Sequence, residues 1–208
     1  MTREETSENI SILNESISAF EWLLNRKYKI TLGHNEKELE IELIFLPKTF
    51  IHLSGISKLT DISLCEDNSK SALYRSIKND ESLRIRIVSS SYFSGIIGRL
   101  YSIIDLKDNF EDVENNRHFK FVKKIAYNYT LIDYDFFIRS DYNNDRYYYF
   151  LRYSGNLSNP NECVLISTFI DNNKDYSIGQ EPMVLLKKII VELDTDIERV
   201  IFDWNNDK

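Results

Sequence analysis

Two runs of alternating apolar and polar residues, separated by a short polar turn, restrict the fold of this chain more than any other feature. The first run covers residues 28–32, and the second covers residues 39–45 with glutamates at alternate positions. Neighbouring side chains of a strand point to opposite faces, so this period places apolar groups on one face and glutamates on the other. The sequence therefore predicts a β-hairpin with one face in water. Pro47 ends the second strand because proline has no N–H to donate to a ladder.

The segment before the hairpin has the period of a helix. Apolar residues from Ile10 to Leu24 are spaced alternately by three and four residues, which is typical of one apolar stripe. The spacing predicts a helix over residues 8–25 whose stripe packs on the core of the domain. The alternative is a stripe that pairs with another subunit, in which case the protein is a homodimer.

The middle of the chain combines helical and strand patterns. Residues 69–79 have a helical pattern, whereas residues 82–90 alternate leucine and isoleucine with arginine, which favours a strand. Residues 91–110 predict a helix that contains Gly95 and Gly98. We expect these two glycines to allow close packing of that helix.

The C-terminal half is rich in strand patterns. Runs at residues 125–139, 147–153 and 164–170 are separated by turn signals, and the β-branched residues of the run at 183–194 favour a final strand over a helix. The predicted fold class is α+β, with an N-terminal helix and β-hairpin, central helices and a C-terminal antiparallel sheet. Without an internal repeat or a linker, we expect one domain over residues 1–208, in which residues 1–25 form the N-terminal helix.

Composition and cysteine usage limit the classes of function. The formal net charge of the 208 residues is −7, so binding of a polyanion must depend on a local patch of positive charge. Cys65 and Cys163 have no partner at metal-ligand or redox spacing, which indicates reduced thiols in a cytoplasmic protein. The start of the chain does not have the pattern of a signal peptide, and no run is long enough to span a bilayer, so we expect no membrane partner.

The common catalytic and cofactor motifs do not occur in this chain. Neither a phosphate-binding glycine loop, nor a zinc-protease helix, nor a serine nucleophile elbow is present. His34, His52 and His118 are too far apart to indicate a metal site, so we expect neither a metal nor a cofactor. His52 is the histidine of most interest, because an imidazole exchanges protons near neutral pH. Its apolar neighbours leave open the alternative of a buried packing residue.

Two candidate neighbouring strands combine arginine with aromatic residues. Alternation places Arg146, Tyr148, Phe150 and Arg152 on one face of the first strand and Leu165, Ser167 and Phe169 on one face of the second. Arginine binds phosphate through paired hydrogen bonds, and aromatic rings stack on unpaired bases, so this face suits single-stranded RNA. The alternative is ordinary cross-strand packing with arginine stems lying over the rings.

A short motif around His52 resembles a known family. Phe50, His52, Leu53 and Gly55 match the F-x-H-L-x-G segment of phage-associated nuclease-like families grouped with barnase, EndoU, the tRNA-cleaving colicins and RelE, in particular the fourth such group. The order Ser167-Thr168-Phe169 resembles the S-x-F element near the last strands of such folds. The resemblance extends over residues 27–170.

The resemblance implies a nuclease-like domain over residues 26–208 that is encoded on a prophage or mobile element and cleaves RNA without a metal. In such enzymes the ribose 2′-hydroxyl attacks the adjacent phosphate while side chains accept and donate protons. His52 would then be the general acid or base, and Ser167 would orient a phosphate oxygen. From their charge and predicted placement, we add Lys58 and Arg152 as groups that stabilise the charged transition state.

Two hypotheses about function follow. The first is a toxin-like, cytoplasmic endoribonuclease of phage origin, with tRNA as the candidate substrate and an immunity protein or other protein as partner. The second is a non-catalytic interaction protein of a prophage or mobile element, which binds a protein partner through its aromatic sheet face or its N-terminal stripe.

Overall fold

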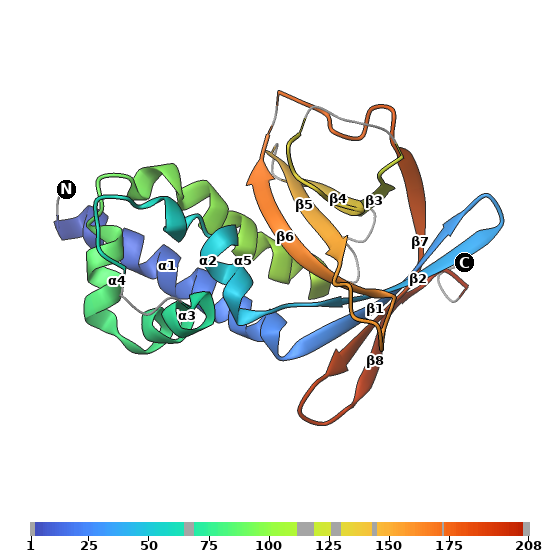
Figure 1. Ribbon diagram of the computed structural model, residues 1–208, viewed down its shortest axis with the longest axis horizontal. Coiled ribbons are helices and arrows are strands. Elements are labelled where there is room, and N and C mark those ends of the chain that lie inside the picture. Colours follow the sequence, from blue (N-terminus) through green and yellow to red (C-terminus); the bar gives the residue numbers. More distant parts are fainter. Residues whose placement is uncertain are drawn as a thin grey trace.

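The computed structural model describes residues 3–64, 69–111, 119–125, 130–142, 145–171 and 173–205. Helices gather at the end of the molecule that carries the N-terminus, and strands form the other end (Figure 1). The helices are α1 (Arg3–Leu24), α2 (Pro47–Leu53), α3 (Lys70–Asn79), α4 (Glu81–Val88) and α5 (Ile97–Glu111), with short 3₁₀ turns η1 (Ile56–Lys58) and η2 (Phe93–Gly95). The strands are β1 (Arg26–His34), β2 (Lys37–Ile44), β3 (Phe119–Lys123), β4 (Phe136–Tyr142), β5 (Asp145–Tyr153), β6 (Glu162–Ile170), β7 (Glu181–Glu192) and β8 (Glu198–Asp203). The expected α+β class is confirmed.

The strands form one sheet that closes on itself. Their order is β1-β2-β6-β5-β4-β3-β7-β8, and β1 also pairs with β7, so seven strands close into a ring and β8 extends it as a hairpin with β7. All of these pairs are antiparallel except β2 with β6, which are parallel where residues 42–44 meet residues 162–164. Parallel neighbours need a long crossover between them. The helices α2 to α5 lie in this crossover, directly after β2.

The predicted hairpin is confirmed as β1 and β2. Its turn consists of Asn35 and Glu36, whose φ angles of 48° and 62° are those of the left-handed backbone that a tight two-residue turn requires. The second strand ends at Ile44, and Pro47 lies in the first turn of α2, where its missing N–H costs no hydrogen bond. The hairpin therefore leads directly into the helix that carries the F-x-H-L-x-G motif.

The strand predicted over residues 82–90 is wrong, because this segment is helix α4. Asp80 caps the helix, and its Oδ1 accepts hydrogen bonds from the backbone N–H groups of Ser82 (2.8 Å) and Leu83 (3.2 Å). Leu83 and Ile87, four residues apart, are buried, whereas Ile85 between them is 43% exposed. The segment is therefore a helix that buries residues four apart, and the alternation with arginine arises because the residues between them face solvent. The cap that starts this helix lies just before the segment.

Several predicted boundaries also differ from the structure. The first helix begins at Arg3 rather than residue 8, and the helix predicted over residues 91–110 is divided into η2 and α5. An added Cβ would meet nothing within 4 Å at Gly95 and only an ordinary contact at Gly98, so the close packing expected at these glycines is wrong.

Further boundaries differ in the C-terminal half. Residues 130–135 lie outside regular structure, and part of the strand predicted over 125–139 lies outside the described residues, as do Cys65 and His118. The run at 183–194 belongs to strand β7, but β8 follows it, so it is not the last strand.

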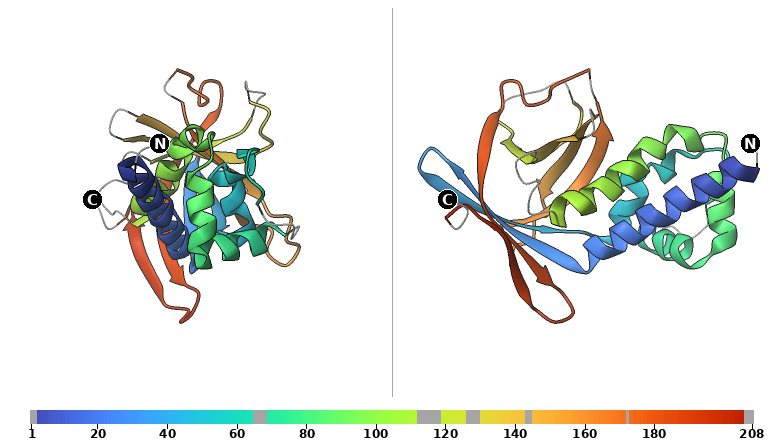
Figure 2. Two further views of the ribbon diagram at one scale, coloured as in Figure 1. Left: turned by 90° about the vertical axis from the view of Figure 1, so that its left-hand side faces the viewer. Right: turned by 180° about the vertical axis from the view of Figure 1, so that it is seen from behind.

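The main core is continuous from the helices into the closed sheet. The apolar stripe of α1 packs on this core, as expected, and α1 and α5 run side by side (Figure 2). Phe20 on α1 is fully buried, and its ring centroid lies 5.2 Å from that of Phe50 on α2 and 5.7 Å from that of Tyr74 on α3. These contacts fix α2 against its neighbours. Within the described residues, none of the helices is long and apolar enough to cross a membrane.

Candidate functional site

His52 lies on the outer side of helix α2. Its neighbours Phe50, Ile51 and Leu53 are at most 1% exposed and anchor the helix in the core, whereas His52 itself is exposed. A helix of this kind buries one face and leaves the other in solvent. The alternative of a buried packing histidine is therefore wrong, and the imidazole is available to a ligand.

Gly55 brings a second element to His52. Its φ of 77° belongs to the left-handed region, and its carbonyl oxygen accepts a hydrogen bond of 2.8 Å from the N–H of Lys58 in η1. An added Cβ at this position would lie 2.8 Å from Cδ of Arg99 and 3.0 Å from Cγ2 of Ile96. The stem of Arg99 on α5 therefore lies directly on the turn that follows α2, and only glycine leaves room for it.

Four cationic or ionisable side chains gather at this turn. We call His52, Lys58, Lys70 and Arg99 the cationic cluster. Burial lowers the pKa of the His52 imidazole, and the charges of Lys70, Arg99 and Lys58 lower it further. The guanidinium of Arg99 is the main cause of a lowered pKa at Lys58, and burial lowers the pKa of Arg99 itself. These shifts indicate that the charges lie close enough to repel one another.

No carboxylate of the described residues compensates the cationic cluster. None of its four members forms an ion pair there, although the chain carries a net charge of −7. Uncompensated positive charge at one place on an acidic protein attracts an anionic ligand to that place. Within the described residues, the cluster is therefore the candidate for the local patch that binding of a polyanion requires.

Asp61 connects the two segments that carry the cluster. Its carboxylate accepts hydrogen bonds from the Ser90 hydroxyl (2.5 Å), the Ser91 N–H (2.7 Å) and the Ser91 hydroxyl (2.8 Å). These hydrogen bonds lower the pKa of Asp61, and the bond from Ser90 has the largest effect. This contact ties the segment that follows η1 to the segment that precedes η2 and α5.

The structure brings together two of the four site residues predicted from the sequence. His52 and Lys58 belong to the cationic cluster, whereas Arg152 on β5 pairs with Asp133 (3.6 Å) and is not among the charges that act on the pKa of His52. Ser167 is only 6% exposed and pairs with Phe150 across β5 and β6. Sequence reasoning missed Arg99 and Lys70, because neither residue is near His52 in the chain and no motif connects them.

The aromatic face predicted to bind RNA is buried. Tyr148 and Phe150 are fully buried. The ring centroid of Tyr176 lies 4.9 Å from that of Tyr148, and the ring centroid of Tyr134 lies 5.0 Å from that of Phe150. A register shift in the pairing of β5 with β6 also places Leu165 opposite Leu151, in the main core, rather than on the face of Ser167. The packing interpretation of these aromatic residues is therefore the correct one.

Other reactive groups of the described residues are few. No three His, Cys, Asp or Glu side chains among them gather in a way that could hold a metal ion. Cys163 is a buried free thiol, and burial raises its pKa to about 12, so it stays protonated near neutral pH.

Comparison with known proteins identifies a family. A family model described as phage-Barnase-EndoU-ColicinE5/D-RelE like nuclease4 matches residues 12–198. No curated protein and no solved structure gives a significant match to the chain. The matched range includes the motif around His52 and the α5 residue Arg99.

Proposed function

The chain belongs to the family of phage-Barnase-EndoU-ColicinE5/D-RelE like nuclease 4, and from this premise we propose that it is a cytoplasmic endoribonuclease that cleaves RNA by attack of the ribose 2′-hydroxyl. The protein is phage-associated and nuclease-like. The observation that carries the proposal is the exposed imidazole of His52 within uncompensated positive charge. We take tRNA as the first substrate to test.

The lowered pKa of His52 suits the role of a general base. Near neutral pH the imidazole is neutral, so it can accept the proton of a 2′-hydroxyl as the oxygen attacks the adjacent phosphorus. The new bond joins the 2′-oxygen to phosphorus, and the bond from phosphorus to the 5′-oxygen breaks. The products are a 2′,3′-cyclic phosphate and a 5′-hydroxyl.

Lys58 and Arg99 supply the remaining chemistry in this proposal. Their charges offset the extra negative charge of the five-coordinate transition state, and the guanidinium can bind two phosphate oxygens at once. Because the pKa of Lys58 is lowered by Arg99, its ammonium is a stronger acid than that of an ordinary lysine. It is therefore our candidate for the proton donor to the leaving 5′-oxygen. Arg152 and Ser167 keep the roles that we predicted only if RNA extends from the cluster to β5 and β6.

The test is incubation of the protein with total RNA and with purified tRNA in a metal chelator. We expect fragments with 2′,3′-cyclic phosphate ends, and a loss of at least about 100-fold in rate for His52→Ala, the usual contribution of general acid–base catalysis. Lys58→Gln and Arg99→Gln should each lose about 100-fold or more. His34→Ala is the matched control, because His34 lies at the end of the β1–β2 hairpin and contacts Pro182 and Glu181 instead.

Two results would contradict the proposal. Cleavage by His52→Ala at the rate of the wild type would remove His52 from the reaction. Intact RNA under all conditions, together with stable co-purification of a protein partner, would favour the non-catalytic interaction protein.

A further inference from the structure

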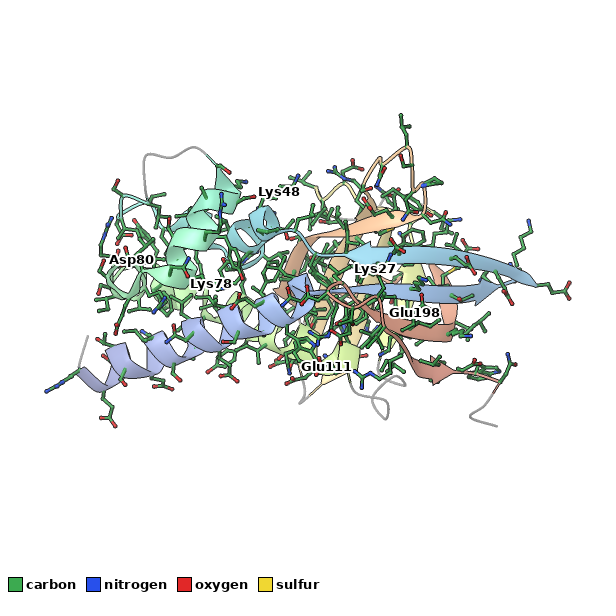
Figure 3. The ribbon with its side chains drawn as sticks, turned by 90° about the horizontal axis from the view of Figure 1, so that it is seen from below. Lys27, Lys48, Lys78, Asp80, Glu111 and Glu198 are labelled. Atoms are coloured by element: carbon green, nitrogen blue, oxygen red, sulfur yellow. The ribbon has the colours of Figure 1, made fainter. Side chains whose placement is uncertain are left out.

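Among the described residues, positive charge without an ion pair continues beyond the residues that would touch the cleaved phosphate. Lys48 lies on α2 four residues before His52 and is exposed; Figure 3 labels it beside this helix. Lys70 is exposed at the first position of α3 and acts on the pKa of His52. Neither lysine has an ion pair or a side-chain hydrogen bond within the parts of the chain that the structure describes.

The cations of strands β1 and β7 are arranged differently. Arg26, Lys27 and Lys29 of β1 pair with Glu192, Glu42 and Glu198 at 2.9, 3.2 and 2.5 Å. Lys187 of β7 pairs with a carboxylate of β8 at 3.5 Å. Lys27 and Glu198 lie on the strands in Figure 3, away from Lys48. These four cations of β1 and β7 are therefore paired with carboxylates, whereas Lys48 on α2 and Lys70 on α3 have no such partner among the described residues. At the other end of α3, Lys78 is paired with Glu21.

The geometry of α2 fits a strand of phosphates. Residues four apart share one face of a helix and are separated by about 6 Å along its axis, so Lys48 and His52 present neighbouring groups on one side. Helix α3 packs against α2, where the ring centroids of Phe50 and Tyr74 lie 5.1 Å apart, and the charge of Lys70 at the start of α3 lowers the pKa of the same imidazole. A single-stranded nucleic acid offers a row of negative charges, which flexible lysines can follow without reading the bases.

We propose that Lys48 and Lys70 bind phosphates of the substrate RNA next to the cleaved one, so that the protein takes a single-stranded polynucleotide rather than a dinucleotide. This inference rests on the proposed function of the cationic cluster and adds the substrate class to it. Lys58 and Arg99 contact the cleaved phosphate, and Lys48 and Lys70 contact its neighbours.

The test measures how salt weakens binding of an uncleavable RNA. The probe is a short single-stranded RNA with methylated 2′-hydroxyls, and fluorescence anisotropy gives its binding constant over a range of salt concentrations. Each phosphate contact on a single strand contributes a slope of about −0.7 in log K against log salt. The three phosphates of this assignment, the cleaved one and its two neighbours, predict a slope of about −2.1 in the wild type, and Lys48→Gln with Lys70→Gln should reduce it to about −0.7.

The control is Lys29→Gln, which removes an exposed lysine of β1 that is already paired with Glu198. It should leave the slope unchanged. A wild-type slope that persists in the Lys48→Gln, Lys70→Gln double variant would overturn the assignment of these lysines, even if the protein cleaves RNA. An absence of binding to the probe would overturn it as well. Salt-dependent binding with the expected loss of slope, but no cleavage of unmodified RNA, would support the phosphate contacts and contradict the proposed reaction alone.

Discussion

Asp105 on α5 offers a quantitative test of the packing between the helices and the closed sheet. Its carboxyl is partly buried, Tyr147 of β5 hydrogen-bonds to it, and among the described residues its Oδ2 has no hydrogen-bond partner. Burial raises the pKa of Asp105 from 3.8 to about 6, while the Tyr147 bond opposes this shift. The folded protein therefore holds this proton more tightly than the unfolded chain does. Its contribution to stability is fully present below about pH 3.8 and is lost as pH rises through about 6.

The magnitude follows from the shift. Two pKa units correspond to about 3 kcal/mol at 1.36 kcal/mol per unit, and we halve this value because solvent screens a partly exposed carboxyl. Asp105→Asn keeps the shape of the side chain and removes its titration. Since part of the loss occurs below pH 4, the free energy of unfolding of the variant relative to the wild type should rise by about 1 kcal/mol between pH 4 and pH 7.5.

Urea unfolding of both proteins at a series of pH values measures this difference. The change with pH is the diagnostic quantity, because a constant cost of placing an amide in the site cancels from it. Asp194→Asn, which makes the same change at an exposed position between β7 and β8, is the control. A difference for Asp105→Asn that does not change between pH 4 and 7.5 would refute the reasoning.

Three further predictions concern the site and its supports. Gly55→Ala should lower the free energy of unfolding in urea by about 1–3 kcal/mol and displace Arg99, with loss of RNA cleavage, because the left-handed backbone and the 2.8 Å approach both exclude a Cβ. Gly95→Ala, where an added Cβ meets nothing within 4 Å, should show neither effect. Asp80→Ala removes the cap of α4 and should lower stability by about 1 kcal/mol in the same assay, and an unchanged midpoint would contradict this role. In single-turnover assays, the acidic limb of cleavage should lie below the usual imidazole pKa of about 6.5, since the pKa of His52 is lowered; a limb above that value would show that another group controls the rate.

The elements predicted correctly are those whose signal lies within a short stretch of chain. The β1–β2 hairpin, α1 and α3 follow from their periods alone. In the structure, Ser69 caps α3 and accepts a hydrogen bond from the N–H of Ala72. The α4 segment shows the limit of this approach. Its alternation matched a strand over a few residues, whereas the cap at Asp80 and the pair Leu83 and Ile87 decide for a helix.

The candidate site was predictable only in part, for the same physical reason. His52 and Gly55 are three residues apart, so a local motif contains both. Arg99 comes from a different helix, and its position on Gly55 depends on the packing of α5 against α2. The burial of Tyr148 and Phe150 likewise depends on segments that cover them from elsewhere in the chain. Sequence patterns show which residues are apolar or aromatic, but they do not show which face is covered.

From its amino-acid order alone, the chain determines its local periods, its hairpin, the motif around His52 and the family whose model it matches. The tertiary structure decides that β1 closes the ring with β7, that β2 and β6 run parallel, and that positive charges from α2, η1, α3 and α5 meet around one imidazole. The reason is that hydrophobic period and turn chemistry act between neighbours in the chain, whereas strand order and charge clustering result from contacts between segments far apart in it.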